Sequence, residues 1–184
     1  MTPRTRHIPI NALLVLTLLL GACSTSPTTH FYTLEPLATS GVALGNSSVR
    51  IGQVTVPELV DRPQMVLRSG ANQVSLAEQQ RWAESLRSGI ARVVAANLAP
   101  PGSAAASATT TVDIDIVRFD SQLGVAIDLA ANWRIRPANG VVRHRSMVWH
   151  EPVSGNEYAD LAAAHSRALA ELSRQIAATV EARP

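Results

Sequence analysis

Apolar and polar residues alternate in the middle of the chain. Every odd-numbered residue from Val125 to Ile135 is apolar. The even-numbered positions include Asp128, Asn132 and Arg134. Successive side chains of a β-strand point to opposite faces, so this alternation predicts a long strand with one buried face.

Two further strands are expected beside this one. One spans residues 110–119 and is followed by a turn over 120–124, and the other spans 141–150. Asn139 and Gly140 precede the latter, and an Asn-Gly pair favours a two-residue type I′ hairpin. The three strands should therefore form an antiparallel meander.

A helical period marks two other segments. In the first, apolar residues recur at spacings of four and three, at Trp82, Leu86, Ile90 and Val93. This pattern predicts an amphipathic helix over 81–98. Ser75 and Glu78 match a capping box, which would start this helix earlier. The second helix should begin near Glu157, and its apolar stripe comprises Tyr158, Leu161, His165, Leu169, Leu172, Ile176 and Val180.

Short apolar runs indicate four more strands, over 31–34, 49–56, 64–68 and 73–77. A sheet and amphipathic helices bury their apolar faces by packing together. We therefore predict an α+β fold, a two-layer sandwich of a mainly antiparallel sheet with two amphipathic helices. Residues 31–184 should form one domain.

The N-terminal segment has the order of an export signal. A leader with two arginines precedes an uncharged apolar stretch over 8–20, and the small residues Gly21 and Ala22 follow. This order is typical of a secretory signal peptide, and the stretch is shorter than the ~20 residues of a membrane-spanning helix. We therefore expect residues 1–22 to be removed rather than kept as a membrane anchor.

Cys23 follows that segment directly and is the only cysteine of the chain. Leu20-Gly21-Ala22-Cys23 resembles a lipobox, where bacteria attach diacylglycerol to the cysteine and cleave just before it. A single cysteine cannot form a disulfide within its own chain, so lipid attachment explains it better. We predict cleavage between Ala22 and Cys23, S-diacylglycerol and N-acyl groups on Cys23, and a lipidated tether over 23–30.

The charge balance argues against nucleic acid as a partner. The chain has 16 basic residues, and removal of the two leader arginines leaves 14, which the 14 acidic residues balance. No basic run is present, so no nucleic-acid binding is expected.

No catalytic, cofactor or metal site is predicted. The chain has no Gly-x-Ser-x-Gly motif, no second cysteine and no phosphate-binding P-loop. Asp113 and Asp115 share one face of a strand, which should be the solvated side of the sheet. His144 and His150 are separated by about 20 Å along a strand, too far to hold one metal ion. His165 lies on an apolar helix stripe and should be a core histidine.

Five blocks occur in the order typical of one protein family and span nearly all of the mature chain. They are Tyr32-Thr33-Leu34, residues 54–68, Arg81-Trp82-Ala83-Glu84-Ser85-Leu86, Val117-Arg118-Phe119-Asp120 and Ala164-His165-Ser166-Arg167-Ala168-Leu169. With them the chain resembles the PqiC/YmbA family, the ABC-type transport auxiliary lipoproteins. Ser85 departs from the family pattern, in which proline is common at this position. The resemblance also favours a helix start near Arg81.

The resemblance implies a role in lipid transport. Such systems pair an inner-membrane ATPase and permease with MCE proteins, whose rings or tubes carry phospholipid across the periplasm. The chain is then expected to be a non-enzymatic outer-membrane component that docks the MCE assembly, supports envelope integrity and forms a homo-oligomeric ring. Ser24 fits this location, because an Asp after the lipidated cysteine is typical of inner-membrane retention.

The loop of Asp61, Arg62, Pro63 and Gln64 is the candidate partner contact, since loops often carry function. A tight structural turn is the alternative explanation for this loop. Two other functions also stay open. A periplasmic lipid-binding carrier or chaperone would need an apolar cavity, whereas the apolar stripes are sized to pack against one another. An envelope enzyme would turn over ester or glycan substrates, and no turnover is expected.

Overall fold

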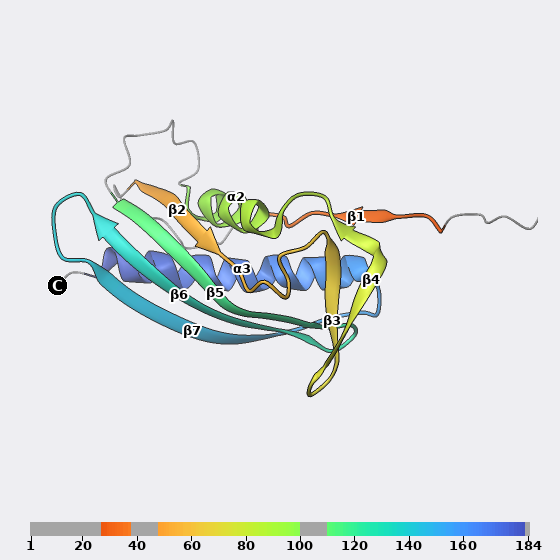
Figure 1. Cartoon of the computed structure of the whole chain (residues 1–184). Helices are drawn as coiled ribbons and strands as arrows, with labels where there is room; N and C mark the ends of the chain where they lie inside the picture. Colours follow the sequence, from red (N-terminus) through yellow and green to blue (C-terminus); the bar gives the residue numbers. More distant parts are fainter. Residues whose placement is uncertain (1–26, 38–47, 100–109, 183–184) are drawn as a thin grey trace, which may run out of the picture.

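The computed structural model describes residues 27–37, 48–99 and 110–182. These residues form seven strands and two helices. In chain order they are β1 (His30–Tyr32), β2 (Val49–Thr55), β3 (Gln64–Gly70), β4 (Gln73–Trp82), α2 (Leu86–Leu98), β5 (Thr110–Gln122), β6 (Ala126–Pro137), β7 (Arg143–Pro152) and α3 (Tyr158–Glu181). The predicted α+β class is confirmed (Figure 1).

The strands divide into two mixed sheets. β2, β5, β6 and β7 form a four-stranded sheet in that order, and β1, β4 and β3 form a three-stranded one. The pairs β3–β4, β5–β6 and β6–β7 are antiparallel, whereas β1–β4 and β2–β5 are parallel. Parallel neighbours need long connections, which is why β1 and β2 pair with strands far along the chain.

β5, β6 and β7 form the predicted meander. The inward side chains of β6 are buried: Ile127, Leu129, Ala131, Trp133 and Ile135. The expectation that Val125 is also buried is wrong, because Val125 lies in the turn before β6 and is 58% exposed. A register shift between Ile116 and Arg118 marks a β-bulge, beyond which β5 continues to Gln122.

The predicted two-residue turn at Asn139-Gly140 is wrong. Such a turn would pair Ala138 with Val141, but the last pair of β6 and β7 is Ile135 with Arg143, a register shifted by one residue. A shift of one residue turns every side chain of a strand to the other face. The burial pattern of the long ladder therefore determines the register, and the connection becomes a longer loop.

The two helices cover one face of the four-stranded sheet. α3 runs along β6 and β7, and α2 lies beside it near β2 (Figure 1). The core between these layers contains fully buried side chains from both helices and from β6: Ile90, Val93, Ile127, Leu129, Leu161, Leu169 and Leu172. The opposite face of the sheet, here called the outer face, carries the polar residues of the alternating strands.

α2 begins at Leu86 and not near Arg81 as predicted. β4 continues through Trp82 instead. Tyr32 of β1 pairs with Trp82, and the N–H of Trp82 donates to the carbonyl of Pro63 at 2.7 Å. Ser85 caps α2 by accepting a hydrogen bond from the N–H of Ser88. The alternative cap at Ser75 is also wrong, since Ser75 lies within β4.

α3 begins where the sequence predicts. Glu157 is its N-cap and forms a capping box with Asp160, whose carboxylate accepts from the N–H of Glu157 at 3.1 Å. With 24 residues, α3 is about 36 Å long. β1 lies at its start, where the ring centroids of Tyr32 and Tyr158 are 6.3 Å apart. At its other end, Arg143 of β7 donates to carbonyl oxygens of the last turn.

Candidate partner-contact site

The loop between β2 and β3 contains three of the four predicted contact residues, Asp61, Arg62 and Pro63, whereas Gln64 is the first residue of β3. The loop is held in a defined turn. The N–H groups of Val60 and Asp61 donate to the carbonyl of Pro57 at 3.0 and 3.2 Å, and the N–H of Arg62 donates to that of Val60 at 2.9 Å. Val60 is buried in the core, so the turn is fixed from below. The loop is thus an ordered turn, and the turn fixes the backbone positions of Asp61 and Arg62.

A hollow of about 330 Å³ adjoins this loop, and we call it the loop hollow. Its walls come from two separate segments: Asp61, Arg62 and Pro63 of the loop, and Trp82, Ala83, Glu84, Ser85 and Leu86 at the junction of β4 with α2. The hydrogen bond from Trp82 N–H to Pro63 holds the segments together. Two of the blocks that define the family resemblance therefore meet around one hollow.

The carboxylates of the loop hollow are both in ion pairs. Asp61 pairs with Arg87 in the first turn of α2, and this hydrogen bond raises the pKa of Arg87. Glu84 pairs with Arg92 one turn further along, with 2.6 Å between Glu84 Oε1 and Arg92 Nη2. Both acids are thus directed toward α2.

Arg62 differs from the other charged residues of the loop hollow. Its Nε atom is buried, yet it has no hydrogen-bond partner among the described residues. An arginine side chain is always charged and carries five donors. Sequence reasoning identified this residue through the loop, but it had no signal for residues 82–86, because only the fold brings them to the same place.

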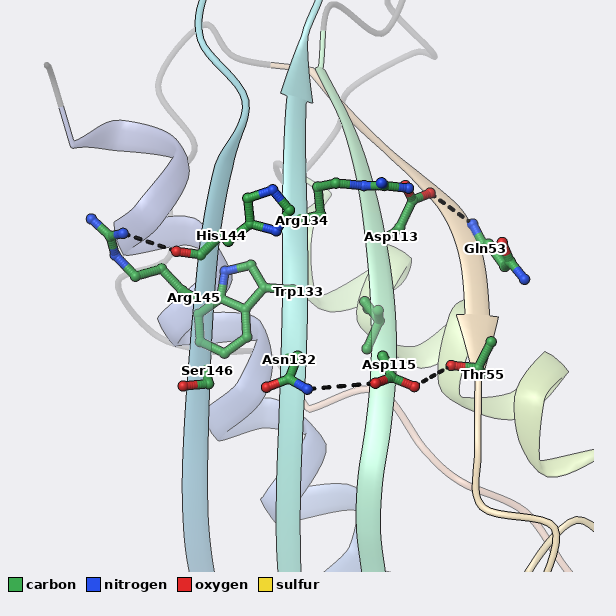
Figure 2. A pocket seen from close by; sticks show the side chains of 11 residues that line it. Gln53, Thr55, Asp113, Asp115, Asn132, Trp133, Arg134, His144, Arg145 and Ser146 are labelled. Atoms are coloured by element: carbon green, nitrogen blue, oxygen red, sulfur yellow. Dashed lines mark hydrogen bonds and ion pairs between the residues drawn. The ribbon is translucent and has the colours of Figure 1, made fainter.

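A larger hollow of about 580 Å³ lies on the outer face of the four-stranded sheet, and we call it the sheet hollow (Figure 2). Four neighbouring strands contribute its lining: Gln53, Thr55, Asp113, Ile114, Asp115, Asn132, Trp133, Arg134, His144, Arg145 and Ser146. The sheet hollow lies near the C-terminal end of α3. Arg143 of β7 contacts that end, and His144, which lines the hollow, is the next residue.

Asp113 is the best-connected side chain of the sheet hollow. Its carboxylate accepts from the N–H of Gln53 at 3.1 Å, from Arg134 at 2.9 Å and from Arg136 at 3.0 Å. Burial opposes its ionisation, but the hydrogen bond from Gln53 and the two guanidinium groups outweigh burial and lower its pKa. Gly52 leaves room for this carboxylate, since a Cβ there would lie 2.3 Å from Asp113 Oδ1 and would displace it.

The prediction that Asp113 and Asp115 lie on the solvated side of the sheet holds only for Asp115. The two do share the outer face, and Asp115 is exposed, with Thr55 and Asn132 as hydrogen-bond donors. The Asp113 side chain is only 13% exposed. The sequence could not reveal this difference, because the arginines that cover Asp113 reach it through the pairing of β5 with β6.

The three histidines considered as candidate ligands in the sequence, His144, His150 and His165, do not form a cluster. His165 is 1% exposed, as predicted for a core histidine, and its Nε2 is 2.9 Å from Ser121 Oγ. His144 and His150 are exposed, and His150 Nδ1 lies 2.7 Å from Asp128. Within the described residues, no three His, Cys, Asp or Glu side chains are grouped to hold a metal ion.

The predicted cleavage and lipidation residues, Ala22 and Cys23, lie outside the described residues, so lipid attachment stays a prediction. Over the described ranges, no helix has both the length and the hydropathy needed to cross a bilayer.

Comparison with known proteins identifies one family. The family model of the ABC-type transport auxiliary lipoprotein component matches residues 32–177. No curated protein matches the chain significantly in sequence.

Two crystal structures share the fold. One, of an uncharacterized protein, is 18% identical and superposes with a TM-score of 0.69 over 84% of this chain and 100% of that one. The other, a DUF330 protein from Xanthomonas campestris, is also 18% identical, with a TM-score of 0.66 over 83% of this chain and 95% of that one. At this identity, the likeness concerns the fold alone.

Proposed function

Because the chain belongs to the family of ABC-type transport auxiliary lipoprotein components, we propose that it docks the periplasmic MCE assembly of a phospholipid transport system at the outer membrane. In this role it is not an enzyme. The inner-membrane ATPase and permease supply the energy, and this chain supplies an anchored contact that supports envelope integrity. The family match over most of the folded domain is the observation that carries the proposal.

Lipid anchoring would make such docking efficient. Six residues lie between Cys23 and His30, where β1 begins, so seven residue-to-residue steps join the two. At no more than ~3.6 Å per residue, this tether spans at most about 25 Å. A domain confined so close to the membrane has a raised effective concentration for a partner that reaches the same surface.

The loop hollow is the proposed contact with the MCE protein. It combines an ordered turn, a concave surface and an arginine without a partner in the described chain. Rigid sites bind with a smaller loss of conformational entropy than mobile ones. The homo-oligomeric ring implied by the family resemblance would repeat this contact around the MCE assembly, and native mass spectrometry of extracted protein would count the copies.

A pull-down from solubilised envelopes tests the docking function. The bait is the full lipidated chain, with Cys23→Ser as the unlipidated control. We expect an MCE-domain protein to be enriched with the lipidated bait, as identified by mass spectrometry. Recovery of no MCE-domain protein with an intact, lipidated bait would refute the proposal.

A lipid-binding carrier is the alternative function from the sequence, and the described hollows offer it little. The sheet hollow is lined largely by polar and charged side chains, and the core side chains of both layers pack against each other. A carrier needs an apolar cavity for the acyl chains. Native mass spectrometry of a Cys23→Ser form, which carries no covalent lipid, separates the two functions, because bound phospholipid would favour the carrier.

A further inference from the structure

Arg62 carries a positive charge that nothing in the described chain balances. Its Nε is buried without a hydrogen-bond partner, and no described carboxylate forms an ion pair with it. A buried donor left unsatisfied is costly, and such groups are rare in native proteins. Arg62 also lines an open hollow, so an acceptor from outside could reach the guanidinium there through its terminal amino groups.

The two acids that line the loop hollow with Arg62 already form ion pairs. Asp61 pairs with Arg87, and Glu84 pairs with Arg92. Among Arg62, Arg87 and Arg92, which line the loop hollow or pair with its acids, only Arg62 has no paired carboxylate in the described chain. A ligand carboxylate would supply one.

We propose that Arg62 binds a carboxylate of the partner protein, inserted into the loop hollow. This inference rests on the proposed docking function and names the chemistry of its contact. The hollow of about 330 Å³ accommodates a side chain or two, and Pro63, Trp82 and Leu86 give it apolar walls. Such walls exclude water and strengthen a charge-assisted hydrogen bond at their edge.

A carboxylate follows from the docking function on which this inference rests, because the bound partner is then a protein. Asp61 and Glu84 lie in the walls and would repel a doubly charged phosphate monoester, whereas a phospholipid phosphodiester carries one negative charge, as a carboxylate does, and binding to vesicles distinguishes the two. The planar guanidinium also matches the two oxygens of a carboxylate in a bidentate arrangement. A partner residue such as Asp or Glu, followed by an apolar side chain, would fit both the charge and the walls.

The test compares arginine variants of the full lipidated chain in detergent, with the MCE-domain protein recovered in the pull-down as the probe. We expect Arg62→Ala to weaken binding at least about tenfold, since a desolvated charge pair loses this much or more when one partner is truncated. The affinity of Arg62→Lys should lie between those of Arg62→Ala and the wild type, because Lys keeps the charge but cannot form two parallel hydrogen bonds to a carboxylate as a guanidinium does. Arg145→Ala, which removes an exposed arginine from the sheet hollow, is the matched control and should bind within twofold of wild type.

A second measurement reports on Arg62 without the partner. In NMR spectra of arginine side chains, the Nε–H signal of Arg62 should shift on titration with acetate and reach saturation. The Nε–H signal of Arg145 should show no saturable shift. Inorganic phosphate and vesicles containing phosphatidylglycerol are the competing probes.

Each result bears on the inference separately from the docking function. Equal binding by Arg62→Ala and wild type would overturn the role of Arg62 while docking stands. Failure of the wild type to bind any MCE protein would refute docking, and the acetate titration would still decide whether Arg62 is a carboxylate site. If Arg62→Ala lost binding to vesicles but not to the protein, a lipid phosphate would replace the carboxylate and the inference would be wrong.

Discussion

His165 lies between two aromatic rings in the core. The ring centroids of Phe119 and Trp82 are 4.3 and 5.4 Å from that of its imidazole, both in edge-on arrangements. Ser121 contacts Nε2, whereas Nδ1 has no partner among the described residues. Burial without a nearby carboxylate disfavours the charged imidazolium, and it lowers the pKa of His165 from 6.5 to about 3.

This pKa predicts how the stability of the fold depends on pH. Between pH 6.5 and 3 the unfolded chain binds a proton at His165 that the folded chain does not, so stability is complete above pH 6.5 and falls as pH decreases. The loss from this residue should be about 2 kcal/mol at pH 5. Urea unfolding at pH 7.5 and pH 5, compared between wild type and His165→Gln, measures it, and the variant should show a smaller decrease. An NMR titration in which the imidazole of His165 titrates near pH 6.5 would contradict this account.

At the level of elements, the sequence predicts those features that depend on local periodicity. The alternation in β6 and the stripe in α3 each identify a buried face, and both are confirmed. The predicted start of α2 and the predicted turn after β6 are wrong, because pairing between distant segments determines both. Trp82 has the spacing of a helix stripe, but β1 and Pro63 hold it in a strand.

The same division applies to the candidate site. The loop 61–64 could be identified from its residues, whereas the opposite wall at 82–86 and the ion pairs of Asp61 and Glu84 depend on the packing of α2. The sequence does not predict the sheet hollow, since Asp113 and Arg134 become neighbours only through the register in which β5 pairs with β6. Contacts between distant segments have no local signal in one sequence.

The position of the α2 cap gives a paired prediction at this scale. Ser85→Ala removes the oxygen that accepts from Ser88 N–H, and it should lower the free energy of unfolding by about 1 kcal/mol. Ser75→Ala is the matched control, because Ser75 is exposed in β4 and should change stability by less than about 0.5 kcal/mol. Chemical denaturation measures both. The reverse ranking would mean that the helix begins earlier in the chain.

For the whole molecule, the two hollows differ in their distance from β1, the strand that follows the predicted tether. β1 lies at the start of α3, and the sheet hollow lies toward its other end, along a helix about 36 Å long (Figure 1). The loop hollow lies nearer to β1, since Trp82 in its wall pairs with Tyr32. In the proposed lipid-anchored form, the proposed contact site therefore lies nearer to the tether and the polar sheet hollow lies farther from it.

Separation of the anchor from the fold leads to a further prediction. Cys23 precedes the first strand by several residues, so Cys23→Ser should abolish lipid attachment while the unfolding midpoint of the domain stays within experimental error. Fractionation of cells should show the wild type with the membranes and the variant released or unprocessed. Unchanged processing and membrane association in Cys23→Ser would contradict the lipoprotein assignment of this residue.

The parallel pairing of β1 with β4 determines how the domain responds to mechanical tension. A partner bound at the loop hollow and a lipid held in the bilayer would pull on opposite sides of this three-residue contact. A pull along the axis of β1 would act in shear and would load its backbone hydrogen bonds to the β4 segment, including Ala83 N–H to Tyr32 O, together. Bonds loaded together resist more force than bonds that open one after another like a zip. In the proposed docked state, β1, the shortest of the described strands, would therefore transmit the pull between the lipid anchor and the partner.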